Sequence, residues 1–165
     1  MKNVALLFLF FYSAIALAQP KMEMTPKGFP AVEIPTPNKP NEKLIEAAKS
    51  WAATFNKNGY DVYDVIQNSL KIDGLRKNAY FYRSLGETYT YNIKYTLEVV
   101  FKTDRSYTLT FSMKEAYAKE VLVKTTIADF YTPDGKLKED FVDVKPSLES
   151  TADKIVKSFS EFIAN

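Results

Sequence analysis

Carboxylate, lysine and tyrosine side chains are the groups in this sequence that could carry out catalysis, because the chain contains neither histidine nor cysteine. Their absence excludes a Ser-His-Asp triad and a thiol nucleophile, and it removes the ligands of ordinary zinc and copper sites. An enzyme built from this chain would depend on paired carboxylates, lysine, tyrosine or a metal held by oxygen ligands. The possible chemistry is therefore narrow.

The acidic residues form two groupings, and neither has the spacing of a known site. Asp61 and Asp64 follow the first predicted helix and are typical of a loop and the start of a strand. In the second grouping, Gly135 is followed by lysines, which place positive charge where a calcium ion would bind. We expect no catalytic residue, no metal site and no bound cofactor. The second grouping comprises Asp129, Asp134, Glu139, Asp140 and Asp143.

Glycine spacing shows no loop of the kind that cradles phosphate. Each glycine is predicted to lie at a turn or a helix end. The glycines are Gly28, Gly59, Gly74, Gly86 and Gly135.

Tyrosine is abundant, with 11 copies, and Tyr80, Phe81 and Tyr82 are adjacent. Successive strand residues face opposite sides of a sheet, so at least one of these rings should leave the core. Together with Tyr131 and Val100, an outward ring would form part of a binding patch. The competing interpretation is a set of scattered exposed aromatics with no function.

Residues 1–18 have the pattern of an export signal. Basic Lys2 precedes an apolar run that ends at Leu17, and small residues surround a cleavage site between Ala18 and Gln19. The alternative is an uncleaved anchor, but the run is shorter than the about 20 residues that a membrane span needs. We expect a periplasmic or secreted protein with no stable membrane insertion after cleavage.

The remaining chain suits one domain, predicted over residues 41–165. A formal net charge of +2 is too small to indicate a nucleic acid or an anionic membrane as partner. No disulfide can form in a chain without cysteine, so the core must hold the fold by packing alone.

Residues 19–40 form a proline-rich leader, which contains six of the eight prolines. The segment 31–34 between two of these prolines is predicted as a possible edge strand, where missing donors are tolerated. A tether is favoured over a proline-rich recognition peptide, because the proline spacing is irregular. Whether the leader docks on the domain stays open.

Two amphipathic helices flank the middle of the chain. The first is capped by Asn41, ends near Asn58 and Gly59, and places Trp51 in its apolar stripe as a core residue. The second begins at Ser147 or Ser150 and carries a stripe that ends with Phe162. Each helix needs a surface on which to bury its stripe.

That surface is predicted to be an antiparallel sheet. Residues 89–101 and 107–113 alternate apolar and polar side chains, which indicates strands with one buried face. A turn centred on Asp104 would place Val99 opposite Leu109 and Leu97 opposite Phe111.

The flanking strands are less regular. Residues 65–72 and 78–85 are predicted as a hairpin that turns at Asp73 and Gly74, and residues 120–128 as a further strand with Tyr117 and Ala118 near its entry. A turn follows at 132–135, and residues 141–144 are predicted as a short strand before Pro146.

The helix at 41–55 with its central tryptophan, the meander around the charged turn 102–105, the export signal and the terminal helix resemble a family of secreted bacterial domains of unknown function. This family has a fold like that of the TATA-box-binding protein (TBP), and the resemblance covers residues 31–164. The long stretch between Met113 and Pro146 departs from the family and leaves its strand count open. The predicted class is α+β, with about five antiparallel strands and both helices on one face. The resemblance implies no activity.

We predict a non-catalytic binding or accessory module of the cell envelope. It would meet an unknown protein, peptide or apolar ligand through the open sheet face or an exposed edge strand. The alternative is a carboxylate- or tyrosine-dependent enzyme that acts on cell-wall or glycan material. Binding of nucleic acid by analogy of fold has the least support, because fold does not specify function.

Overall fold

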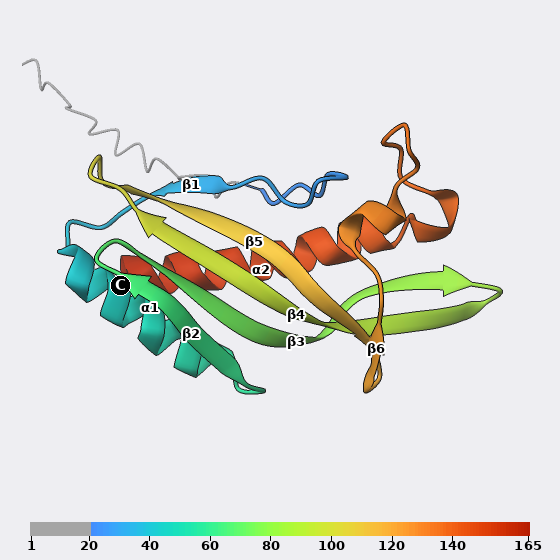
Figure 1. Cartoon of the computed structure of the whole chain (residues 1–165), viewed down its shortest axis with the longest axis horizontal. Helices are drawn as coiled ribbons and strands as arrows, with labels where there is room; N and C mark the ends of the chain where they lie inside the picture. The colour runs from blue at the N-terminus through green and yellow to red at the C-terminus, as the bar shows by residue number, and fades with distance from the viewer. Residues whose placement is uncertain (1–20) are drawn as a thin grey trace, which may run out of the picture.

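The structure is a computed structural model and describes residues 21–165. The predicted signal at residues 1–18 lies outside this range. Six antiparallel strands form one sheet in the order β1-β5-β4-β3-β2, with β6 also paired to β5 (Figure 1). The strands are β1 (Val32–Pro35), β2 (Tyr60–Ile66), β3 (Ser69–Ser84), β4 (Glu87–Phe101), β5 (Ser106–Ala118) and β6 (Val121–Val123).

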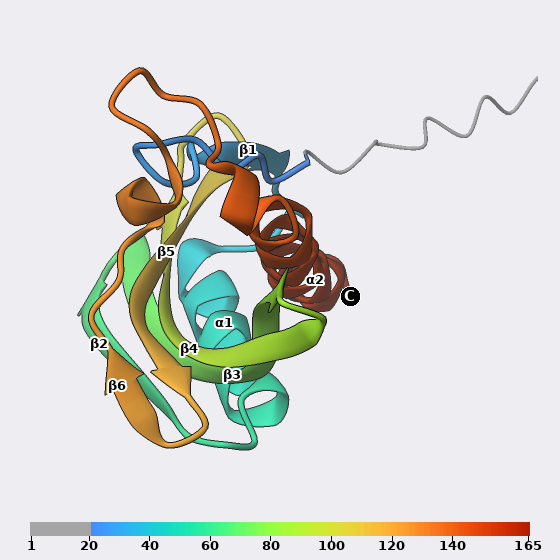
Figure 2. The same ribbon diagram turned by 90° about the vertical axis from the view of Figure 1, so that its right-hand side faces the viewer.

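Helices α1 (Asn41–Phe55) and α2 (Val144–Ala164) cover one face of this sheet. Figure 2 shows the sheet curling around the two helices, so that its concave side is filled and its convex side is open. Trp51 is only 1% exposed and lies between the rings of Phe55 and Phe159, at centroid distances of 4.8 and 5.1 Å. The predicted α+β class, the helix arrangement and the core position of Trp51 are confirmed.

The predicted register of the central hairpin is also confirmed. Val99 pairs with Leu109, and Leu97 pairs with Phe111. All four side chains are buried on the helix side. The alternation of apolar and polar residues was sufficient to predict this register, because a slip of one residue would expose the whole apolar row.

Both helices begin differently from the prediction. Asn41 is the first helical residue rather than the cap, and the carbonyl of Pro40 accepts the N–H groups of Lys43 and Leu44. Helix α2 begins at Val144, and Pro146 lies in its first turn, where a missing N–H costs no helical hydrogen bond. The expected short strand at 141–144 is therefore wrong. At the other end of α2, Phe162 is 36% exposed and Ile163 is buried in its place.

Gly74 is not a turn residue. Strand β3 runs straight through Asp73 and Gly74, and the β2–β3 hairpin turns after Ile66 instead. A Cβ at Gly74 would lie 2.5 Å from Oδ1 of Asn56 and 2.7 Å from the Tyr95 hydroxyl. Glycine is needed here because the Tyr95 ring and the Asn56 side chain pack on the backbone.

The chain between β5 and α2 forms little sheet. Tyr117 and Ala118 belong to β5, and β6 ends at Val123, so the strand expected over 120–128 is mostly wrong. Two 3-10 helices follow, η1 (Ile127–Phe130) and η2 (Glu139–Phe141), with the predicted turn at Thr132–Gly135 between them. Ile127 and Phe130 supply apolar side chains without strand pairing, which explains why the apolar pattern resembled a strand.

Residues 21–40 of the leader pack on the domain rather than acting as a tether. Strand β1, predicted at 31–34, forms at Val32–Pro35 and pairs with β5. Before it, residues 21–31, here called the strap, turn back at Thr25 and Gly28. The strap's Met22 and Met24 are fully buried. Among the residues that the structure describes, no helix is long and apolar enough to cross a membrane.

Candidate functional site

Asp143 and Asp129 of the second grouping form local hydrogen bonds. The Arg83 guanidinium holds both carboxylate oxygens of Asp143, at 3.0 and 2.6 Å, and lowers the pKa of that carboxyl below its usual value. Asp129 accepts hydrogen bonds from the N–H and hydroxyl of Thr126 and caps η1. Within residues 21–165, no group of three or more acidic side chains is arranged to hold a metal ion.

Asp61 and Asp64 lie in different surroundings. Asp64 forms an ion pair with Lys71 at 2.8 Å. Asp61 lies opposite Asp73 in the β2–β3 register, beside a groove of about 340 Å³ on the open face. The Asp73 carboxylate accepts hydrogen bonds from the hydroxyls of Tyr63 (3.1 Å) and Thr96 (2.5 Å). This carboxylate is therefore engaged within the sheet.

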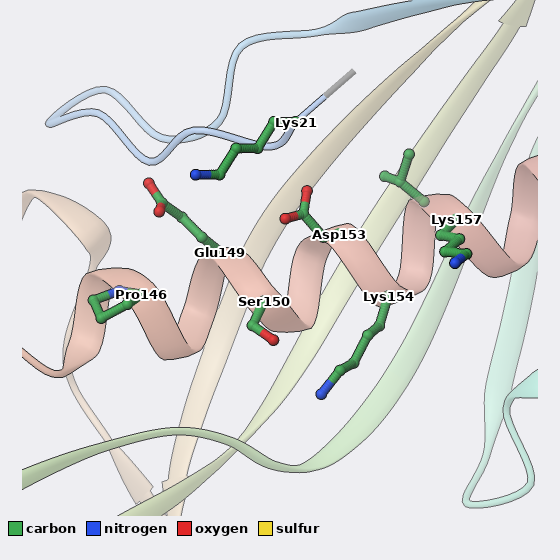
Figure 3. A pocket seen from close by; sticks show the side chains of 8 residues that line it. Lys21, Pro146, Glu149, Ser150, Asp153, Lys154 and Lys157 are labelled. Atoms are coloured by element: carbon green, nitrogen blue, oxygen red, sulfur yellow. The ribbon is translucent and has the colours of Figure 1, made fainter. Parts of the chain in front are cut away.

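A second pair of carboxylates lies on α2, in a hollow of about 470 Å³ that Lys21 helps to line (Figure 3). The Met22 N–H donates to Asp153 at 2.7 Å, and the Met24 N–H donates to Glu149 at 2.8 Å. Because both carboxylates accept hydrogen bonds from the strap backbone, the hollow marks the contact between the strap and α2.

The adjacent aromatic residues are mostly structural. Tyr80 is 2% exposed and stacks on Tyr91 at 4.9 Å, and its burial raises the pKa of its hydroxyl. Phe81 is the ring that leaves this cluster, and Arg83 lies 5.9 Å from its centroid. Tyr131 is 8% exposed and donates its hydroxyl to the Met24 carbonyl at 2.8 Å. One ring leaves the core as predicted, but the predicted patch is not assembled, because Tyr131 is buried.

The outer edge of β5 is covered at both ends and open in the middle. Strand β1 pairs with residues Ser106 to Leu109, and β6 pairs with Ala116 to Ala118. Figure 1 shows β1 and β6 at opposite ends of β5. The segment between them, Thr110–Glu115, has no strand on its outer side in the described chain and is here called the β5 gap.

The register identifies the backbone groups that point out of the gap. The Thr36 N–H donates to the Arg105 carbonyl at 2.8 Å on the β1 side, and the Lys102 N–H donates to the Ser106 carbonyl on the β4 side. Backbone groups alternate direction along a strand, so those of Phe111 and Met113 point outward. No hydrogen bond joins these outward groups to any described residue. Lys114 bulges out of the β4–β5 register and ends the regular edge.

A groove of about 390 Å³ runs along this edge. One wall is the turn of the strap with Phe29, and the other is the chain that enters η1 with Ile127. The ring of Phe29 packs edge-on against Phe111 at 5.2 Å. The groove therefore combines unpaired backbone on its floor with apolar side chains on its walls.

The gap is surrounded by lysines that lack acidic partners. Lys27 lines the groove, Lys114 lies within the gap, and Lys124 directly follows the residue that pairs with Ala116. None of the three lysines forms an ion pair with a described residue. Glu115 lies within the gap and accepts the Tyr117 hydroxyl, and the Asp129 carboxylate binds Thr126 in the groove wall. Three lysines therefore stand against two carboxylates, which leaves a small excess of positive charge.

An exposed edge strand is one of the binding surfaces predicted from the sequence, but its location is not. The lengths of the two strands could have located the open edge. The alternating pattern of β5 is longer than the strand predicted at 31–34, so that strand cannot cover the whole edge of β5. The gap was missed because residues 120–128 were predicted as one further strand, whereas β6 ends at Val123.

The fold is of the α+β, TBP-like class, and two solved structures share it. One is a DUF4468 family protein from Bacteroides ovatus ATCC 8483, with a TM-score of 0.56, 10% identity and coverage of 88% of each chain. The other is a TBP-like protein from Parabacteroides distasonis ATCC 8503, with a TM-score of 0.54, 10% identity and coverage of 82% of this chain and 92% of the other. No family model and no curated protein matches the sequence. At such identity the likeness establishes the fold alone.

Proposed function

We propose that this protein is an exported, non-catalytic module of the bacterial cell envelope that binds a partner protein at the β5 gap. The observation that carries the proposal is the pair of outward backbone groups at Phe111 and Met113, which lie in a groove without a strand beside them. Native proteins usually cover, twist or charge such edges, because an open edge is a template for pairing.

Support for export comes from residues 1–18, whose basic start, apolar run and small residues suit a cleaved signal. Mass spectrometry of the protein from the periplasm or medium tests this part. We expect a mature chain that begins at Gln19. Recovery of the intact chain from the membrane fraction would contradict it.

The alternative is a carboxylate- or tyrosine-dependent enzyme on glycan or cell-wall material, and it has less support. The carboxylates of Glu149 and Asp153 hold the strap, and Asp73 holds two hydroxyls of its own sheet. Hydrolysis of a peptidoglycan or glycan substrate that is lost in Asp73→Asn would favour the enzyme.

Photo-crosslinking from the gap tests the binding proposal. A photoreactive phenylalanine analogue at Ser112, whose side chain is exposed within the gap, should crosslink a defined partner in the envelope fraction. The same analogue at Lys49, on the exposed side of α1, is the control. A partner specific to the gap appears at position 112 and not at position 49.

A change in the backbone of β5 then tests whether the crosslink depends on its open edge. Met113→Pro removes the outward N–H without touching the pairing with β4, and Met113→Ala is the matched control because it keeps the N–H. We expect the crosslink at position 112 to disappear only in the proline variant. A crosslink that persists in Met113→Pro would overturn the proposed site.

A further inference from the structure

We infer that the occupant of the β5 gap is an extended, acidic peptide segment that adds to the sheet as a strand beside β5. The inference rests on the proposed function and names the chemistry of the partner. Its grounds are the direction of the backbone groups, the shape of the groove and the surrounding charge.

The backbone geometry fits one short strand. The regular part of the gap runs from Thr110 to Met113, which is roughly 13 Å at about 3.3 Å per residue. Phe111 and Met113 each present one N–H and one C=O to the outside. An extended peptide at the usual strand spacing meets these groups with its own N–H and C=O, as in recognition by strand addition.

The walls determine which side chains such a peptide carries. Residues opposite one another in a sheet point to the same face. A peptide residue opposite Phe111 therefore points to the helix side, where Phe29 and Ile127 offer apolar contacts. Its two neighbours point to the open face. The groove thus suits an apolar residue between two polar ones.

The charge determines the sign of those polar residues. Lys27 lines the groove, Lys114 lies within the gap and Lys124 follows the last residue of β6, and none of the three has a carboxylate partner in the described chain. They outnumber the two carboxylates there, Glu115 and Asp129, both of which already accept hydrogen bonds. Glutamate or aspartate in the peptide would complement them, whereas lysine or arginine would be repelled. The predicted motif alternates acidic and apolar residues.

The probe is a synthetic, end-blocked peptide of sequence Gly-Glu-Val-Glu-Val-Glu-Gly, and the charge control replaces each glutamate with lysine. Amide hydrogen exchange of the mature chain reports where the probe binds. The Phe111 and Met113 amides, which point outward, should become about tenfold slower in exchange when the acidic peptide is bound. Thr110 and Ser112 point to β4 and should change less.

Variants separate the contribution of backbone hydrogen bonds to peptide binding from the contribution of the lysine charges. Met113→Pro should weaken binding of the acidic peptide by about tenfold relative to Met113→Ala, because one hydrogen bond is lost. The double variant Lys27→Glu/Lys114→Glu should bind the lysine peptide better than the glutamate peptide. Lys57→Glu, which lies between α1 and β2, is the control and should keep the original preference.

Four outcomes would overturn the inference. Equal binding of the two peptides would remove the acidic preference, and binding unaffected by Met113→Pro would remove strand addition. Failure of the acidic peptide to bind at millimolar concentration would reject this ligand class, while the crosslink from Ser112 would still test the proposed function separately. Analytical sedimentation of the protein without peptide tests whether a second copy of the chain fills the gap. Self-association that Met113→Pro abolishes would assign the gap to that second copy.

Discussion

The two halves of the outer edge of β5 differ in what covers them, although one strand with one alternating pattern forms both. From Ser106 to Leu109 the backbone pairs with β1. From Thr110 onward it has no partner strand until β6 begins to pair at Ala116. The edge is therefore covered or open because of the neighbouring chain and not because of β5 itself.

Proline explains where the coverage stops. Continuing the β1–β5 register beyond the pair of Val32 and Leu109 would place Pro30 opposite Phe111. Pro30 has no N–H to donate to the outward carbonyl of Phe111, so the pairing cannot extend. The strap leaves the edge here, and its Phe29 packs against the Phe111 ring instead. The leader therefore closes one half of the edge and leaves a groove in the other.

The largest expected effect is a difference in stability between two neighbouring residues of the open half, one on the buried face of the sheet and one on the exposed face. Phe111→Ala should lower the free energy of unfolding by about 3–5 kcal/mol, because its buried ring packs against Phe29 and Tyr95. Ser112→Ala, one residue away and exposed, should change it by less than about 0.5 kcal/mol. Urea denaturation measures both values. Similar values for the two would show that the open half does not belong to the packed sheet.

The next effect tests how the strap is held. Glu149→Ala should destabilise the protein by about 1–3 kcal/mol, because the buried Met24 N–H loses its acceptor. Glu149→Gln keeps an oxygen at that place and should cost less. Thermal unfolding of both variants checks the order, and a glutamine variant as unstable as the alanine variant would show that charge, not the hydrogen bond, holds the strap.

A proline comparison between the two halves should give a smaller difference. In the covered half, Val32→Pro removes the N–H that pairs with Leu109 and should cost about 1 kcal/mol more than Val32→Ala. In the open half, Met113→Pro should match Met113→Ala within about 0.5 kcal/mol, since its N–H has no partner to lose. Urea denaturation of the four variants measures the difference. Equal penalties in both halves would mean that the gap is covered in solution.

The smallest expected effect concerns pH. Arg83 lowers the pKa of Asp143 from its ordinary value of 3.8, so this carboxylate stabilises the fold above about pH 4, and the contribution is lost as the pH falls through the lowered pKa. The buried hydroxyls of Tyr95 and Tyr107 have raised pKa values, so their contribution is present below about pH 10 and is lost at higher pH.

Between these limits the stability should be nearly constant, because the chain has no histidine to titrate. Unfolding free energies measured from pH 3 to pH 11 test this profile. Asp143→Asn should slightly reduce the loss of unfolding free energy at acidic pH. Asp140→Asn is the control, because Asp140 has no hydrogen bond to Arg83. A marked change near pH 6 would contradict the assignment.

Much of the fold follows from local patterns in the chain. Alternation over β4 and β5 determined their register, and spacing of apolar residues in α1 identified Trp51 as core. These predictions succeed because a wrong face would expose an entire apolar row to water. Gly74 shows the opposite case, since the Tyr95 ring that requires glycine there comes from a different strand.

Local patterns in the chain predicted the α+β class, the two covering helices and the central hairpin, and the composition excluded histidine and cysteine chemistry. Three features depend instead on contacts between remote segments: the strap docks on Glu149 and Asp153, Tyr80 and Tyr131 are buried, and the β5 edge stays open between β1 and β6. The physical reason is distance along the chain. Periodicity reports which face of an element is apolar, whereas pairing at an edge depends on where remote segments run and where a residue such as Pro30 ends them.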